Sequence, residues 1–438
     1  MLPSGHAREG LALSQAFLIC PEPVRRLTAG VGTRFVALAR VLVDAGHRVT
    51  LAIPNDPTEA SIENDGIDVI HGDPTRLGEF AAGHDWVMLH GHLGNHYLSQ
   101  RDDLPVVVDL YDPFMVENFH YHRELGFEPY RTDHATWRLQ MSRGDFFLCS
   151  SEEQRLYYLG WLTALGRVNP VTAENDPSMR RLIVELPFGT VDTPPPGPAR
   201  RSEVLPDVAD DAPVIYFGGI YNWYDPLLVL DTLDELLERD SRTVVVFVDH
   251  PHPELTPLTA ASHARQAARD RGWLGRQVRF ESWRPFDRRF ELAQISDVAV
   301  VTHRPGLETD LSLRTRLVDL LWLGLPVVVT AGGTMARVVA ETGAGEVVQA
   351  GDSTKLAAAV RRLLDDPDRR RSASEAGRRW AETRDWGSAA EPLLDFAREP
   401  WRDPHRDRFT DLAPEAANAE EPAGQRLRRV LRRFGGGS

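Results

Sequence analysis

The stretch from His303 to Gly333 gathers side chains that can bind anions and hydroxyl groups. Guanidinium groups bind phosphates through paired hydrogen bonds, and carboxylates accept hydrogen bonds from hydroxyls. The polar residues of the stretch are Glu308, Thr309, Asp310, Ser312, Arg314, Arg316 and Asp319. They predict a binding site, the alternative being a solvated first helical turn whose acids favour the helix dipole and whose arginines pair locally.

The elements around these residues would place them at a sheet edge. Val298 to Thr302 is an apolar run typical of a buried strand, and leucines at helical spacing predict a helix from about Ser312 to Leu323. Gly324 is expected to end this helix, and Leu325 to Thr330 reads as a second buried strand. Strand, loop, helix and strand in succession put the loop at the carboxyl edge of a parallel sheet, where open α/β sheets bind ligands.

Two strands of the amino-terminal half end beside ionisable residues. Trp86 to His90 ends in His90, and Val106 to Leu110 leads into Asp112. We interpret both residues as candidates for catalysis, with Asp112 as the base or the ligand of an acceptor hydroxyl, although an Asp-Pro pair also forms turns. His90 and His92 lie two residues apart, but no third ligand follows at a convincing spacing, so no metal site is predicted.

Glycines follow the first predicted strand of each half. Gly30 and Gly32 lie before a helix predicted from Thr33 to Ala45, and Gly218 and Gly219 follow Val214 to Phe217. Glycines between a strand and a helix let backbone N–H groups approach a phosphate, though they also serve plain chain reversal.

The segment from Glu308 to Pro326 resembles the retaining glycosyltransferases of family 4, which have the GT-B fold. A bacterial subgroup of that family carries the pattern E-T-x-F-S-x-R-T-R-x-x-D-x-L-W-x-G-L-P, and this chain reads similarly. By this resemblance Glu308 would position the donor sugar and Asp319 would hold the nucleotide ribose. Leu311 stands where the wider family has its first Glu, so the loop must differ in length or shape.

The resemblance covers roughly residues 12 to 398 and implies further roles. The first glycine loop would face the donor phosphates or the acceptor, with Arg34 as an anion partner, and residues 282 to 288 lie where the family holds the base. Family members have an Arg and a Lys in the second glycine loop, and this chain has neither. Backbone amides of Gly218 and Gly219, with Arg314 or Arg316, would then have to neutralise the diphosphate.

Composition indicates a globular protein of two or three domains: 438 residues, 42% hydrophobic and 26% charged. The formal net charge of −14 argues against a nucleic-acid partner. The two cysteines, Cys20 and Cys149, are too few for a disulfide framework and favour a cytoplasmic location. The apolar run from Leu11 to Cys20 is too short for a membrane span and lacks a basic segment before it.

We therefore predict an α/β protein of two doubly wound, Rossmann-like domains facing each other across a cleft. The expected divisions are an amino-terminal acceptor domain (1–190), a linker (191–213), a carboxyl-terminal donor domain (214–385), a closing helix (386–400) and a flexible tail (401–438). In the tail, apolar and arginine residues of 425–434 fall on opposite helical faces, which suggests weak contact with an anionic membrane or, alternatively, a solvated or docked basic helix.

The predicted reaction is transfer of a sugar from a nucleotide-sugar donor, with retention and without metal or other cofactor. The acceptor would be a glycan, a lipid-linked molecule or a small molecule. One alternative keeps the fold but changes the reaction, to that of a sugar-nucleotide epimerase or a phosphorylase. A second is a catalytically silent scaffold in a glycan-assembly complex, which the missing Arg and Lys would explain.

Overall fold

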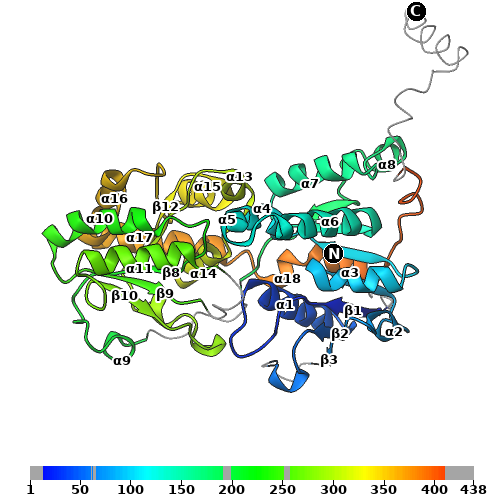
Figure 1. Cartoon of the computed structure of the whole chain (residues 1–438), viewed down its shortest axis with the longest axis horizontal. Helices are drawn as coiled ribbons and strands as arrows, with labels where there is room; N and C mark the ends of the chain where they lie inside the picture. The colour runs from blue at the N-terminus through cyan, green and yellow to red at the C-terminus, as the bar shows by residue number, and fades with distance from the viewer. Residues whose placement is uncertain (1–12, 61, 63–65, 191–198, 251–256, 410–438) are drawn as a thin grey trace, which may run out of the picture.

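The computed structural model describes residues 13–60, 62, 66–190, 199–250 and 257–409. Two lobes lie side by side, the first coloured blue to green-cyan and the second green to orange (Figure 1). Each is built on a wholly parallel sheet, of seven strands in the first domain and six in the second. The predicted fold class is thus confirmed.

The first sheet has the order β3-β2-β1-β4-β5-β6-β7. Its strands are β1 (Gln15–Ile19), β2 (Arg48–Ile53), β3 (Ile67–His71), β4 (Trp86–Leu89), β5 (Val106–Asp109), β6 (Phe146–Cys149) and β7 (Ile183–Glu185). The helices are α1 (Gly30–Asp44), α2 (Leu77–Phe80), α3 (Gly91–Gln100), α4 (Phe114–Glu117), α5 (His122–Leu125), α6 (Glu128–Arg143), α7 (Glu152–Ala164) and α8 (Pro170–Asn175).

Helices cover both faces of this sheet, as the packing of alternate side chains of β1 shows. Ala16 and Leu18 pack into one hydrophobic cluster, and Phe17 and Ile19 pack into another on the opposite face. Because both faces of the sheet are covered and exclude water, its central strands are continuous apolar runs, in which apolar and polar residues do not alternate.

The second sheet has the order β10-β9-β8-β11-β12-β13. Its strands are β8 (Val214–Gly219), β9 (Val244–Val248), β10 (Val278–Glu281), β11 (Val298–Val301), β12 (Val327–Thr330) and β13 (Gly345–Val348). The helices are α9 (Arg201–Val204), α10 (Pro226–Arg239), α11 (Thr259–Asp270), α12 (Glu291–Gln294), α13 (Leu307–Leu311), α14 (Thr315–Leu323), α15 (Gly333–Thr342), α16 (Ser353–Asp365) and α17 (Pro367–Ala381).

The order of each sheet reverses at its first strand, so that β1/β4 and β8/β11 are the switch points where such sheets bind ligands. Gly324 ends α14 in the left-handed conformation (φ +73°), as expected for a helix C-cap. The predicted loop before that helix is different: residues 307–311 form the short helix α13, and α14 begins three residues later than expected, at Thr315.

The chain then returns to the first domain through α18 (Trp386–Ala389) and α19 (Glu391–Arg398) (Figure 1). Trp386, Leu393 and Phe396 are buried in the core of that domain. Residues 401–409, expected to begin a flexible tail, continue this packing: Trp401 contacts Phe146 at 5.0 Å between ring centroids, and Arg406 is 2% exposed.

Arg406 is buried because it forms ion pairs with Asp102 and Asp145 of the first domain. The structured part of the chain therefore ends later than predicted, and the basic segment 425–434 lies outside the described residues. The linker is also shorter than expected, since Leu205 and Val208 pack beneath β8 and β9. Among the described residues, no helix is both long enough and apolar enough to cross a membrane.

Candidate active site

A cavity of about 780 Å³ lies between the two domains. Its walls come from the carboxyl ends of both sheets and the helices that follow them, so the two switch points face each other across it. The polar and aromatic lining residues include Glu22, Tyr111, Asp112 and Glu117 of the first domain, and Tyr221, Trp223, Arg284, Arg289, Ser312, Arg314, Arg316 and Asp319 of the second.

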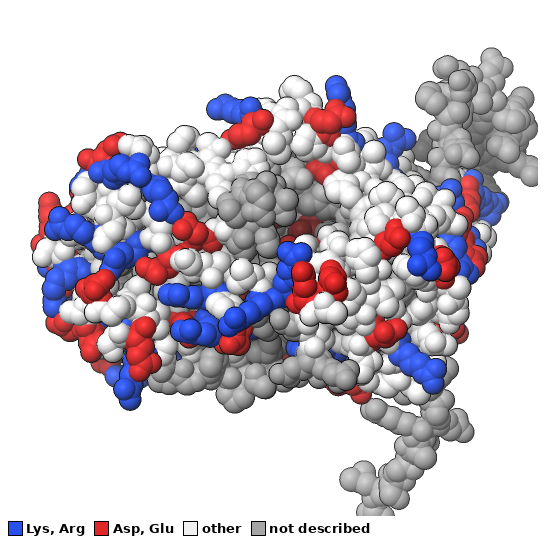
Figure 2. Space-filling model, turned by 60° about the horizontal axis from the view of Figure 1, so that its bottom comes forward, with Lys and Arg blue, Asp and Glu red and all other residues white. Residues whose placement is uncertain are grey.

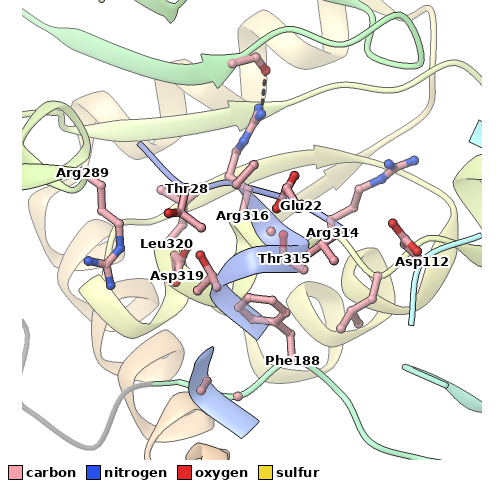
Figure 3. Close-up of a pocket in the computed structure, with 18 of the residues that line it drawn as sticks. Glu22, Thr28, Asp112, Phe188, Arg289, Arg314, Thr315, Arg316, Asp319 and Leu320 are labelled. Carbon is pink, nitrogen blue, oxygen red and sulfur yellow. Dashed lines mark hydrogen bonds between the residues drawn. The ribbon is translucent and has the colours of Figure 1, made fainter. Parts of the chain in front are cut away.

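Figure 3 shows the order of these groups along the cavity. Arg289 and Asp319 lie at one end, Arg314 and Asp112 lie at the other, and Arg316 is between them. The sequence analysis predicted four of these five residues for the site, and the structure places all four in the lining of one cavity.

Arg316 connects α14 with the glycine turn after β8. Its Nη1 donates to the carbonyl oxygen of Phe217 at 2.7 Å and its Nη2 donates to that of Gly219 at 2.6 Å. The guanidinium carbon also lies 4.5 Å from the centre of the Tyr224 ring, within the range of a cation–π contact. A positive charge therefore reaches the glycine turn from a different element, although the turn itself carries no Arg or Lys.

Gly218 makes this approach possible. Its φ of +86° is in the left-handed region, and a Cβ on it would lie 3.2 Å from the guanidinium carbon of Arg316. Both the backbone conformation and the close contact thus require glycine at this position.

Glu308 is buried behind the lining of the cavity. It is 3% exposed, its Oε2 pairs with Arg314 Nη2 at 2.5 Å, and its Oε1 accepts from Ser312 Oγ at 3.0 Å. Thr309 also faces away from the cavity lining, because its hydroxyl donates to the carbonyl of Arg304 at 2.7 Å. The groups that reach the cavity from this segment are therefore Ser312 and Arg314.

Asp319 and Arg289 mark the far end of the cavity. Burial raises the pKa of Asp319 to about 6, and the positive charge of Arg289 opposes that rise. Burial lowers the pKa of Arg289, while Asp319 raises it. A carboxylate on a helix that lines the cavity can accept hydrogen bonds from ligand hydroxyls, so the position of Asp319 in α14 is consistent with ribose binding.

On the opposite wall, His90 and Asp112 form an ion pair of 3.1 Å between Nε2 and Oδ1. His90 Nδ1 contacts the backbone carbonyl of Asp109 at 2.7 Å. Burial lowers the pKa of His90, but the charge and hydrogen bond of Asp112, together with those of Asp109, outweigh this effect and the pKa rises to about 9. His90 is 4% exposed and is behind the lining, so Asp112 is the member of the pair that faces the cavity.

The first glycine segment is the first turn of α1, since that helix begins at Gly30. Gly30 lines the cavity, whereas the N–H of Gly32 donates to Glu22 Oε2 at 2.6 Å. Arg34, expected to face an anion, is fully buried and pairs with Asp109 at 2.7 Å and 3.0 Å. Its guanidinium therefore supports the end of β5 and does not line the cavity.

Sequence reasoning missed two acids of the cavity, Glu22 and Glu117. Burial raises the pKa of Glu22 to about 7, against the hydrogen bond from Gly32. Burial, reinforced by Asp112 and Glu308, raises the pKa of Glu117 to about 8. Glu22 follows β1 and Glu117 follows β5, so their position after strand ends was the signal that could have identified them.

The two walls of the cavity differ in charge. The second domain contributes four arginines and one acid, and the first domain contributes four acids and two arginines. These are Arg284, Arg289, Arg314, Arg316 and Asp319 of the second domain, and Glu22, Asp44, Asp112, Glu117, Arg25 and Arg40 of the first. In the described part of the chain, no group of three or more His, Cys, Asp or Glu residues is arranged to hold a metal ion. On the face shown in Figure 2, acidic and basic side chains are interspersed.

Comparison with known proteins places these features among glycosyltransferases. Residues 212–366 match the family model described as glycosyl transferases group 1. A D-inositol 3-phosphate glycosyltransferase from Corynebacterium aurimucosum is 28% identical over 225 residues, which are 50% of this chain and 51% of that protein. The chain thus spans about half the length of the curated relative that it matches.

Solved structures match over most of the chain at low identity. A sucrose-phosphate synthase from Thermosynechococcus elongatus has a TM-score of 0.64 and 15% identity, covering 88% of this chain and 98% of that one. HepE of Anabaena, solved with UDP and glucose, has a TM-score of 0.61 and 13% identity, covering 87% and 98%. The chain therefore has the GT-B fold of these glycosyltransferases, and its second domain, residues 212–366, matches the glycosyl transferases of group 1.

Proposed function

We propose that the protein is a glycosyltransferase that uses a nucleotide-sugar donor. The observation that carries the proposal is the cavity between the domains, in which the arginines of the wall contributed by the matched domain face the carboxylates of the other wall. A nucleotide diphosphate is anionic, so the arginine wall suits the donor and leaves the first domain for the acceptor. HepE, which shares the fold, was solved in complex with UDP-glucose.

The proposed roles follow from the geometry. Asp319 accepts hydrogen bonds from the ribose, and Arg316 with Arg314 stabilises the diphosphate as negative charge develops on it during bond cleavage. Glu308 holds Arg314 at 2.5 Å and so orients it toward the cavity. Asp112 accepts a hydrogen bond from the acceptor hydroxyl, while His90 holds its carboxylate in place.

We further propose that the enzyme belongs to the retaining transferases of family 4 and needs no metal ion. Retention at the anomeric carbon would follow if the acceptor oxygen attacks from the face that the diphosphate leaves. In that arrangement the C–O bond to the diphosphate breaks, a C–O bond to the acceptor forms, and the acceptor proton passes to the departing diphosphate. Arginines supply the positive charge that a metal provides elsewhere.

The position of Arg316 also bears on the alternative that the protein is a catalytically silent scaffold in a glycan-assembly complex. That alternative rested on the missing Arg and Lys of the glycine turn, and Arg316 supplies a guanidinium to the same turn from α14. The epimerase and phosphorylase alternatives differ from transfer in their co-substrates. An epimerase would turn over the donor without an acceptor, and a phosphorylase would cleave a glycan only with phosphate.

The proposed acceptor is a glycan, a lipid-linked molecule or a small molecule, and the proposed location is the cytoplasm, where the unpaired thiols of Cys20 and Cys149 stay reduced. For a lipid-linked acceptor, we propose that the basic segment of residues 425–434 makes weak contact with the inner face of the membrane.

A thermal-shift screen with UDP-, GDP- and dTDP-sugars tests the donor proposal, because a ligand that binds the folded state raises the melting temperature. We expect one nucleotide to raise the melting temperature of the wild type and a smaller rise in Asp319→Ala. Arg371→Ala, an exposed change on α17, is the control and should respond like the wild type. No response to any nucleotide sugar at millimolar concentration would overturn the proposal.

A further inference from the structure

Ser312 connects two carboxyl groups that belong to different domains. Its Oγ lies 3.2 Å from Oε1 of Glu117 at the end of α4 and 3.0 Å from Oε1 of Glu308 on α13. Glu117 belongs to the first domain and lines the cavity, whereas Ser312 and Glu308 belong to the second. The serine hydroxyl is thus a polar contact across the interface, beside the groups assigned to the donor.

Counting the protons shows which of these groups is neutral. A serine hydroxyl has one hydrogen to donate, and an ionised carboxylate has none. If both carboxyl groups were ionised, one of the two O···O contacts would contain no hydrogen. Each contact can have a hydrogen of its own only if one carboxyl group is protonated and donates to Ser312 Oγ.

Glu308 is the member that remains ionised, because it pairs with Arg314 at 2.5 Å. Within the described residues, Glu117 forms no ion pair: Arg314 pairs with Glu308, and the negative charge of Asp112 disfavours ionisation of Glu117. The proton therefore belongs on Glu117, whose O–H donates to Ser312, whose own O–H donates to Glu308.

The surroundings of Glu117 agree with this assignment. The charged groups that act on it are Asp112 from the segment after β5, Glu308 from α13 and Arg314 at the start of α14. The phenols that feel its charge are Tyr111, Tyr121, Tyr158 and Tyr221, all of which have raised pKa values. Burial, with Asp112 and Glu308, raises the pKa of Glu117 from 4.5 to about 8, against the effects of Arg314 and Ser312.

We propose that Glu117 is a protonated positioning residue that connects the first domain to the Glu308–Arg314 pair through Ser312. Its effect on catalysis rests on the proposed function, because Arg314 is assigned to the donor diphosphate. Ionisation of Glu117 would place a further negative charge beside Glu308 and Asp112 and remove the donor from its contact with Ser312. The contact across the cavity would then weaken, and Arg314 would lose part of its support.

The direction of the pH dependence follows from the raised pKa. Below about pH 4.5, Glu117 is protonated whether or not the contact is made, so the stabilisation of the contact is complete. Between these values the equilibrium constant for making the contact decreases by about tenfold per pH unit as the pH rises toward 8. Above about pH 8 it is lost.

Carboxyl ¹³C NMR of glutamate-labelled protein measures the protonation state of Glu117 and does not require an active enzyme. We expect one glutamate resonance to titrate near pH 8 in the wild type and to be absent from Glu117→Gln. Glu128→Gln removes an exposed acid of α6 that pairs with Arg131, and it should leave this titration unchanged. Glu22, whose pKa is raised to about 7, should titrate in the wild type and in Glu117→Gln. If the resonance that is absent from Glu117→Gln titrates below about pH 6 in the folded wild type, Glu117 is ionised and the proposal fails.

Kinetics then test the positioning role separately. The amide N–H of Glu117→Gln can donate to Ser312 at any pH, so this variant should keep activity within about threefold of the wild type at pH 7. Its kcat should stay level from pH 7.5 to 9, whereas that of the wild type should fall by about eightfold over this range, with a midpoint near pH 8. Glu117→Ala should lower kcat at all pH values, with a smaller change in the acceptor KM.

Equal alkaline profiles of the wild type and Glu117→Gln, with the NMR titration present, would overturn the positioning role. Absence of nucleotide-sugar binding in the wild type and in both Glu117 variants would instead overturn the proposed function, and the NMR result would still decide the protonation of Glu117.

Discussion

Arg316 on α14 donates a hydrogen bond of 2.6 Å to the backbone carbonyl of Gly219, which ends β8. These residues are far apart in the sequence, yet together they make the part of the second domain that faces the cavity. The carbonyl oxygens of the turn hold the guanidinium, so less side-chain entropy is lost when it binds an anion. This arrangement explains how a glycine turn without its own cation can belong to a diphosphate site.

Replacing Arg316 with Ala should weaken nucleotide binding by about 1.5–3 kcal/mol, the usual range for a charged hydrogen-bond partner. Arg316→Lys should recover only part of this loss, because a lysine cannot donate to both carbonyl groups and the diphosphate. Titration calorimetry with the nucleotide from the screen measures the effect, with Arg371→Ala as the control. An unchanged dissociation constant in Arg316→Ala would remove Arg316 from the donor site.

Asp319→Asn should raise the melting temperature of the ligand-free protein while weakening nucleotide binding by about 1–3 kcal/mol. Because burial raises the pKa of Asp319 to about 6, its stabilising contribution is complete below pH 3.8 and is lost as the pH rises through about 6. At pH 7.5 the ionised carboxylate therefore destabilises the free protein, and the amide removes that cost. Scanning calorimetry and nucleotide titration at pH 7.5 measure both changes; a loss of melting temperature without a loss of affinity would make Asp319 structural.

The sequence predicted the two sheets well because their central strands are buried on both faces. The predicted strand from Val298 to Thr302 is a case in which an apolar run leaves little ambiguity, since Val298–Val301 is buried along its whole length. Short helices were harder to predict, since α13 spans five residues and its acids are also compatible with a loop. The sequence analysis placed the end of the structured chain too early, because nothing in the sequence marks Arg406 as a buried residue. Its burial depends on its ion pairs with Asp102 and Asp145.

For the site, the sequence predicted which elements meet but not the direction of each side chain. Two arginines lie near the glycine segments. Arg34 follows Gly30 and Gly32 in the sequence, and Arg316 contacts the glycine turn after β8 in the structure. The structure turns Arg34 inward to Asp109 and leaves Arg316 in the cavity wall. The sequence does not show which partner each guanidinium meets, because Asp109 and Gly219 become neighbours only in the folded chain.

Treatment with EDTA should leave glycosyl transfer unchanged, because we assign the neutralisation of the diphosphate to Arg314 and Arg316. The measurement is initial velocity before and after EDTA treatment and desalting, followed by additions of Mg²⁺ and Mn²⁺. Restoration of a lost activity by either ion would show that the arginines do not suffice.

Glu308→Gln should lower the melting temperature of the protein and should also abolish most of the glycosyl transfer. The structure shows Glu308 buried and paired with Arg314, so the amide would leave a buried guanidinium without its counter-charge. Removing one partner of a buried ion pair typically costs about 3–5 kcal/mol in the free energy of unfolding. The double variant Glu308→Gln/Arg314→Met removes the unpaired charge and should recover much of that stability, but not the activity. Urea unfolding and initial velocities separate the two effects, and full activity in Glu308→Gln would show that the pair is not needed for transfer.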